Sequence, residues 1–110
     1  MKNLIVLVFA ILLTGQYTPY QADIAKKYSI MYRDVTVNMK DEVICNGKIA
    51  LGCTRWFKGG RKVIDISNKT TKQFPFVLNH ELGHYNLDTV DENRADNWAM
   101  GMINFIKSME

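Results

Sequence analysis

The sequence predicts an α+β fold, a small mixed β-sheet flanked by helices, and three patterns support this prediction. Hydrophobic and polar residues alternate from residue 35 to residue 40, as in a strand with one buried face. The turn sequence Lys58-Gly59-Gly60-Arg61 precedes Lys62–Ile66, in which three of five residues are Val or Ile. Hydrophobic residues then recur every three or four positions as far as Met109, which indicates helices.

The expected elements follow in order along the chain. A helix is predicted over residues 22–32, because Ile24, Tyr28 and Met31 are at helical spacing. A strand over 35–40 and a hairpin of residues 50–57 with 62–66 come next. Two helices complete the domain, the first ending near residue 87 and the second beginning near residue 92. Their expected buried sides are Phe74, Val77, Leu78, Leu82 and Tyr85, and then Trp98, Met102, Ile106 and Met109.

The segment His80-Glu81-Leu82-Gly83-His84 has the pattern H-E-x-x-H within the first of these two helices. At 3.6 residues per turn, His80 and His84 point the same way and can share one metal ion, with Glu81 beside the open coordination position. Zinc would hold and polarise a water molecule, and Glu81 would accept its proton and pass it to a leaving amine. Gly83 is unfavourable inside a helix, so it predicts close packing of another element between the two histidines.

Two histidines are one ligand short of the three that a catalytic zinc usually has. Glu92 is the candidate for the third ligand, and Asp96 lies on the same face of the helix that begins there. Thr89-x-x-Glu92 also fits a capping box, in which case Glu92 would cap the helix, and Asp88 and Asp91 would be alternative ligands. The alternative to a role in metal binding is that His80, His84 and Asp96 are ordinary surface polar residues.

Together with the H-E-x-x-H segment, the pattern E-x-x-A-D-x-W-A from Glu92 to Ala99 resembles the gluzincin metallopeptidases. The likeness extends over roughly residues 48–106, with its specific motifs in 80–99. It implies zinc ligands at His80, His84 and Glu92, a general base at Glu81, and a role for Asp96 in orienting a ligand imidazole. The longer metzincin pattern fails, because it requires Gly where this chain has Leu87 and His or Asp where it has Val90.

The same resemblance raises expectations about the surroundings of the site. In gluzincin-like folds the strand before the zinc helix forms the rim of the active site, and Val63–Ser67 occupies that position in the sequence. Such enzymes usually stabilise the oxyanion with a His or a Tyr. No third histidine exists, so Tyr28, Tyr32 and Tyr85 are the candidates.

The N-terminus carries ten consecutive apolar residues, Leu4 to Leu13, behind Lys2. This run is too short for a comfortable membrane span and is typical of a secretory signal. Residues 1–22 are therefore predicted to be a signal peptide or an N-terminal membrane anchor acting through residues 4–13, and residues 23–110 the zinc-peptidase-like domain. A first helix buried in the fold is the alternative.

Cys45 and Cys53 are the only cysteines, and seven residues separate them. An even count in a small exported domain predicts a disulfide, whereas the alternatives are two reduced buried thiols or a structural zinc site shared with His80 and His84. The formal net charge is +3, and loss of residues 1–22 removes Lys2 alone and leaves +2. A charge this small excludes an argument for nucleic acid as a partner.

These patterns predict a zinc-dependent metallopeptidase with a peptide or protein substrate, exported to the periplasm or the extracellular space or anchored by its N-terminus. Two alternatives stay open. One is a catalytically silent binding module that zinc stabilises, which would tolerate loss of Glu81. The other is a membrane-tethered regulatory peptidase of a mobile element, with reduced cysteines and an uncleaved leader.

Overall fold

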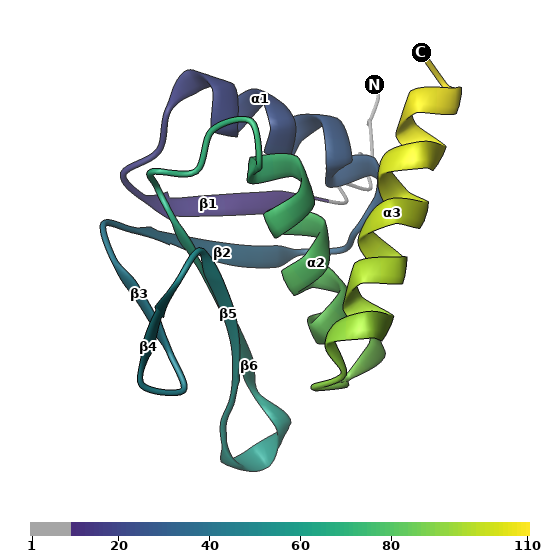
Figure 1. Ribbon diagram of the computed structural model, residues 1–110. Helices are drawn as coiled ribbons and strands as arrows, with labels where there is room; N and C mark the ends of the chain where they lie inside the picture. Colours follow the sequence, from purple (N-terminus) through teal and green to yellow (C-terminus); the bar gives the residue numbers. More distant parts are fainter. Residues whose placement is uncertain (1–9) are drawn as a thin grey trace, which may run out of the picture.

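The computed structural model describes residues 10–110, and Figure 1 shows how their helices and strands are arranged. The predicted fold class is confirmed, because within this described range a small mixed sheet packs with three α-helices. The elements are β1 (Ile11–Gly15), α1 (Pro19–Tyr28), the short 3₁₀ helix η1 (Ser29–Met31), β2 (Val35–Lys40), β3 (Val43–Cys45), β4 (Lys48–Ala50), β5 (Gly52–Trp56), the 3₁₀ turn η2 (Lys58–Gly60), β6 (Lys62–Ser67), α2 (Phe74–Leu87) and α3 (Glu92–Ser108).

The main sheet has the strand order β1-β2-β6-β5. Strands β1, β2 and β6 are parallel, whereas β5 pairs antiparallel with β6 through the predicted turn. The predicted alternation in β2 is confirmed, since Val35, Val37 and Met39 are buried while Thr36 and Lys40 are exposed. In register with them, Ile64 and Ile66 of β6 complete the buried face of the sheet.

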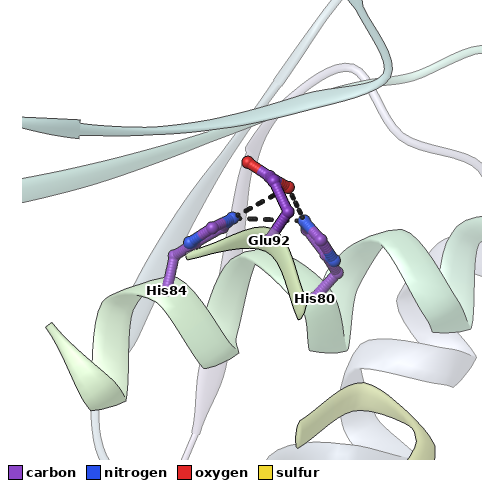
Figure 2. A group of neighbouring side chains, drawn as sticks. All are labelled: His80, His84 and Glu92. Carbon is purple, nitrogen blue, oxygen red and sulfur yellow. Dashed lines mark hydrogen bonds and ion pairs between the residues drawn. The ribbon is translucent and has the colours of Figure 1, made fainter. Parts of the chain in front are cut away.

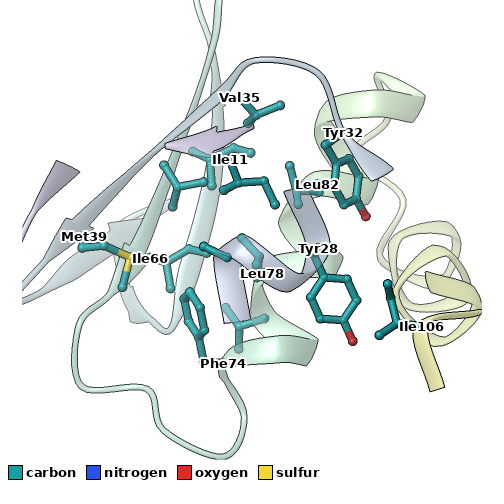
Figure 3. Packing of buried hydrophobic residues seen from close by; sticks show 14 residues of the cluster. Ile11, Tyr28, Tyr32, Val35, Met39, Ile66, Phe74, Leu78, Leu82 and Ile106 are labelled. Carbon is teal, nitrogen blue, oxygen red and sulfur yellow. The ribbon is translucent and has the colours of Figure 1, made fainter. Parts of the chain in front are cut away.

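Helix α2 covers this buried face and forms one core with it (Figure 3). Phe74, Leu78 and Leu82 of α2 are all completely buried. On α3, Ile106 is buried and Trp98 and Met102 pack against the same core, but Met109 is 54% exposed because it lies after the last turn of the helix. The predicted hydrophobic stripe of this helix therefore ends at Ile106.

The folded domain includes residues that the sequence predicted to be part of a leader. Residues 11–15 form β1, and Ile11 is buried where it pairs with Val35 of β2. Helix α1 begins at Pro19 because Thr18 and Gln21 form a capping box, in which each side chain accepts a hydrogen bond from the other's backbone N–H. The helix expected over residues 22–32 thus covers Pro19–Tyr28 and gives way to η1.

Gln21 connects α1 to the loop that precedes α2. Its side chain is completely buried, and its Nε2 donates to the backbone oxygens of Asn68, at 3.0 Å, and Thr70, at 2.7 Å. Part of the segment predicted as a leader, residues 11–22, therefore contributes a strand, a helix start and a buried polar contact to this domain. Residues 1–9 of the predicted leader lie outside the described residues. None of the helices within residues 10–110 is long and apolar enough to cross a membrane.

The expectation that Val63–Ser67 forms the rim strand is wrong. Strand β6 lies in the interior of the sheet between β2 and β5, so its hydrogen-bonding groups are used on both sides. The edge strand next to α2 is β5 (Figure 1). Antiparallel strands β3 and β4 form a separate hairpin, and a disulfide between Cys45 and Cys53 connects this β3–β4 hairpin to β5.

A chain that begins at residue 23 tests what the N-terminal segment contributes. We expect its free energy of unfolding to be more than about 3 kcal/mol lower than that of residues 10–110. Burial of an isoleucine contributes about 1.5–3 kcal/mol, and each hydrogen bond of Gln21 contributes about 1 kcal/mol. Urea denaturation followed by circular dichroism measures the difference. Equal midpoints and slopes would mean that residues 10–22 are dispensable for folding.

Candidate metal centre

Helix α2 carries both histidines on the side that faces the N-terminus of α3 (Figure 2). Their Nε2 atoms lie 3.1 Å apart, and their rings meet edge to face with centroids 4.7 Å apart. His84 is buried and His80 half-buried. The four-residue spacing places the rings one helical turn apart, so both reach the same point in space.

Each imidazole is oriented by an acceptor on its other nitrogen. His80 Nδ1 lies 2.7 Å from Asp96 Oδ1, and His84 Nδ1 lies 2.8 Å from the backbone oxygen of Thr89. Neither a carbonyl oxygen nor an ionised carboxylate can donate a hydrogen bond. Each Nδ1 therefore donates its hydrogen to the oxygen beside it. In the neutral rings both Nε2 atoms then present lone pairs toward each other, an arrangement that a cation between them would stabilise.

Glu92 brings a carboxylate to the same point from the first turn of α3. Its Oε1 lies 2.8 Å from His80 Nε2 and 3.4 Å from His84 Nε2. The helix is capped by Asp91 instead, whose Oδ1 accepts from the backbone N–H groups of Asn93 and Arg94. Glu92 therefore does not cap α3 through a box with Thr89, and its carboxylate faces the histidines.

The spacing of these three atoms suits a single metal ion. Ligand atoms about 2.0–2.1 Å from a tetrahedral zinc ion lie roughly 3.3 Å from one another. The three observed separations of 3.1, 2.8 and 3.4 Å are each within about half an ångström of that value. Among the residues that the structure describes, His80, His84 and Glu92 are the group able to hold a metal ion. Two neutral imidazoles and one carboxylate are also a donor set that zinc prefers.

Glu81 lies beside this group, on the side that faces β5. Its Oε1 accepts a hydrogen bond of 2.8 Å from Thr54 Oγ1, which also lies 3.1 Å from the Glu81 backbone oxygen. Burial raises the pKa of Glu81, while the hydrogen bond from Thr54 and the neighbouring histidines act in the opposite direction. Gly52 makes room for this carboxyl group, because a Cβ there would lie 3.0 Å from Glu81 Oε2.

The two alternative ligands have other partners. Asp91 caps α3, and Asp88 accepts a hydrogen bond of 2.8 Å from Trp56 Nε1 and lies 3.5 Å from Lys62 Nζ. These two contacts lower the pKa of Asp88, with the bond from Trp56 as the larger cause. Trp56 in turn meets the His84 ring edge-on, with centroids 6.4 Å apart. Asp88 therefore ties the end of α2 to the β5–β6 hairpin.

The group opens into a cleft of about 440 Å³. Strand β5 lines it with Gly52, Thr54 and Trp56, α2 with the histidines and Glu81, and the β3–β4 hairpin with residues that include Asn46, Lys48 and Ile49. The cleft is therefore bounded by an edge strand, the helix that carries both histidines and a hairpin fastened by the disulfide.

The three tyrosines considered as oxyanion donors do not line this cleft. Tyr28 is buried in the core, and Tyr32 donates to Asn79 Oδ1 at 2.7 Å and accepts from Trp98 at 3.0 Å. Tyr85 lies beneath Lys62, whose ammonium is 4.7 Å from its ring centroid. Two side-chain donors in the cleft wall, Thr54 and Trp56, already donate to Glu81 and Asp88. Asn46 and Lys48 are further donors in the same wall. Sequence reasoning missed both of them and also Thr54, because only long-range strand placement brings them to the site.

The structure contains the Cys45–Cys53 disulfide, so these sulfurs are not reduced thiols and do not join His80 and His84 in a shared metal site. The bridge joins the end of β3 to the second residue of β5, directly beside the cleft. It therefore fixes the β3–β4 hairpin against the edge strand.

Comparison of the chain with protein-family models, with curated proteins and with solved structures gives no match. The resemblance to the gluzincins therefore rests on the residues between His80 and Ala99. The geometry of the site supports a metal-binding group independently of that resemblance.

Substitution of Gly83 tests whether close packing of α3 against α2 is needed to assemble the site. A Cβ at this position would lie 3.0 Å from Trp98 Cβ and 3.2 Å from Ala95 Cα, whereas a Cβ at Gly101 of α3 would have no atom within 4 Å. Gly101→Ala should therefore raise the free energy of unfolding by up to about 1 kcal/mol through helix propensity. Gly83→Ala should lose that gain to overpacking, and it should weaken zinc binding by moving α3, and Glu92 with it, away from α2.

Chemical denaturation and competition for zinc with a chromophoric chelator measure the two effects. We use the name metal group for His80, His84 and Glu92. If both substitutions stabilised the protein equally and left zinc affinity unchanged, close packing at Gly83 would not be the condition for this group.

Proposed function

We propose that this chain is a zinc-dependent peptidase. The observation that carries the proposal is the convergence of His80 Nε2, His84 Nε2 and Glu92 Oε1, with both Nδ1 atoms already occupied by acceptors. A buried carboxylate beside these atoms and an adjacent cleft support a hydrolytic reaction rather than a purely structural ion.

The zinc ion, when bound, supplies a Lewis acid that lowers the pKa of a water molecule toward neutrality and polarises a substrate carbonyl. Glu81 acts as the general base: its carboxylate accepts a proton from the attacking water and passes it to the departing amine. Thr54 holds the Glu81 carboxylate by its 2.8 Å hydrogen bond, so the side chain of the base is already oriented before the reaction begins. Asp96 and the Thr89 carbonyl keep the two imidazoles in the orientation that binds metal.

Strand β5 supports binding of an extended peptide. Phe57 N donates to Arg61 O and Ser67 N donates to Leu51 O, so the odd-numbered residues of this segment bond to β6. In an antiparallel pair the bonding direction alternates, so the backbone groups of Gly52, Thr54 and Trp56 point away from β6 toward the free edge. A substrate strand pairing with this edge would pass directly over Glu81 and the metal group.

The disulfide supports a location outside the reducing cytosol, because bridges of this kind persist in oxidising compartments. We therefore favour an exported enzyme over a regulatory peptidase that faces the cytoplasm. The leader in residues 1–22 remains part of this proposal, although any cut would have to leave β1 in place for the fold described above.

A catalytically silent, zinc-stabilised binding module is the second candidate function. It is favoured by one observation: among the residues described in the cleft wall, Asn46 and Lys48 are the side-chain donors available for an oxyanion, in place of the usual His or Tyr. The two candidates differ in what they require of Glu81.

Replacement Glu81→Gln separates these functions. For a peptidase, the variant should keep its zinc and lose about 10²- to 10⁴-fold in kcat/KM, because the amide cannot accept the proton. Zinc content by atomic absorption and cleavage of a peptide library by mass spectrometry provide the measurements. Glu42→Gln, at an exposed position in the turn between β2 and β3, is the matched control and should behave as the native chain.

Zinc-loaded native protein that cleaves nothing in the library would contradict the peptidase and favour the binding module. Cleavage that survives in Glu81→Gln within tenfold of native would contradict the assigned base.

A further inference from the structure

The tip of the β5–β6 hairpin is strongly basic. Residues 55–62 contain four basic residues and no acidic one. We use the name basic tip for Arg55, Phe57, Lys58, Arg61 and Lys62. Phe57 is 39% exposed and lies under two guanidinium groups, with Arg61 Cζ 4.7 Å and Arg55 Cζ 5.4 Å from its ring centroid. The aromatic ring thus holds two cations close together at the surface.

Two of the four cations have carboxylate partners and two do not. Arg55 Nε lies 2.8 Å from the buried Asp65 Oδ2, and Lys62 Nζ lies 3.5 Å from Asp88 Oδ1. Within residues 10–110, Lys58 and Arg61 form no ion pair. Their charges are available to an anionic ligand.

Two residues of the basic tip, Arg55 and Phe57, line a hollow that adjoins the cleft of the metal group. This hollow of about 450 Å³ shares Cys53, Thr54 and Trp56 with that cleft. Thr54 contacts Glu81, and Phe57 lies three positions further along the chain, about 10 Å away at 3.3 Å per residue. An extended peptide whose scissile bond lies at the metal would therefore reach the basic tip with a residue three to five positions away.

We propose that the basic tip selects peptides with acidic side chains three to five residues from the scissile bond, on the side that runs toward the β5–β6 turn. The inference rests on the proposed peptidase and names its substrate class. Lys58 and Arg61 bind the carboxylates, and Phe57 keeps the Arg61 guanidinium in place.

The acidic turn between α2 and α3, beside the cleft, favours a peptide over a polyanion. Asp88, Asp91 and Glu92 lie at the turn between α2 and α3, next to the hairpin. A phosphate backbone needs positive charge along its whole length and would meet these carboxylates, whereas a peptide can place its acidic residues at the basic tip alone.

Binding to zinc-loaded Glu81→Gln protein tests the selection without depending on catalysis. Three labelled peptides of equal length share a neutral centre and carry Glu, Gln or Lys at three to five residues on both sides of it. Fluorescence anisotropy at low salt should give roughly five- to tenfold tighter binding of the Glu peptide than of the Gln peptide, and weaker binding of the Lys peptide. The preference should shrink at high salt.

Charge variants locate the effect. Lys58→Glu/Arg61→Glu should reverse the order of the peptides, and the milder Lys58→Gln/Arg61→Gln should remove the preference. Lys69→Glu/Lys72→Glu makes the same charge change at exposed positions of the β6–α2 loop and should keep the native order. Circular dichroism confirms that each variant is folded.

Equal binding of the three peptides, no binding of any, or a preference that survives Lys58→Glu/Arg61→Glu would overturn the selection. The selection would also be overturned if the three peptides were not discriminated and the protein instead bound phosphatidylserine vesicles, with this vesicle binding lost in Lys58→Glu/Arg61→Glu. That result would assign the basic tip to a membrane surface. Hydrolysis of the Gln peptide by the native enzyme without charge preference would refute the selection and leave the peptidase standing. Charge-selective binding without any hydrolysis would refute the peptidase instead.

Discussion

The contact between α2 and α3 at Gly83 is the constraint on which the metal group depends. Gly83 lies opposite Ala95 and Trp98, and the residues at these positions allow the two helix backbones to approach closely. Ala95 and Ala99 of α3 are both completely buried. Because only four residues lie between α2 and α3, the close approach brings Glu92 within 2.8–3.4 Å of the two Nε2 atoms. A side chain at position 83 would separate the ligands that the two helices supply.

Both histidines and Glu81 are held by neighbours outside the site. Asp96 and the Thr89 carbonyl orient the imidazoles, Asp91 caps α3 and so leaves Glu92 free, and Thr54 holds Glu81. These supports come from α3, from the turn between α2 and α3, and from β5, whose pairing with β6 positions Thr54. Without a cation, the site brings two lone pairs and a carboxylate together, an arrangement that is unfavourable by itself and that a divalent ion would neutralise. The geometry thus supports metal binding more directly than it supports any particular substrate.

The local parts of this arrangement could be predicted from the sequence, whereas the long-range parts could not. The positions of His80, His84 and Asp96 follow from helical periodicity, and Gly83 inside a helix indicated that another element packs closely there. Which strand forms the edge was mispredicted, because Val63–Ser67 follows β5 in sequence but pairs on both sides. The apolar run that ends at Leu13 suggested a leader by composition, yet part of it pairs with β2 in parallel, and such pairing leaves no local signature. Thr54 was missed because a threonine in a strand indicates nothing until its partner on α2 is known.

The most direct test of a metal centre shared by α2 and α3 is zinc stoichiometry and affinity, measured on the full chain, on Glu92→Ala and on Glu42→Ala. We expect one zinc ion in the native chain, affinity at least tenfold weaker in Glu92→Ala, and native behaviour in Glu42→Ala, since exposed Glu42 lies outside the metal group. Full zinc affinity in Glu92→Ala would contradict the role of α3 in the site. Native protein that binds no zinc would contradict the account as a whole.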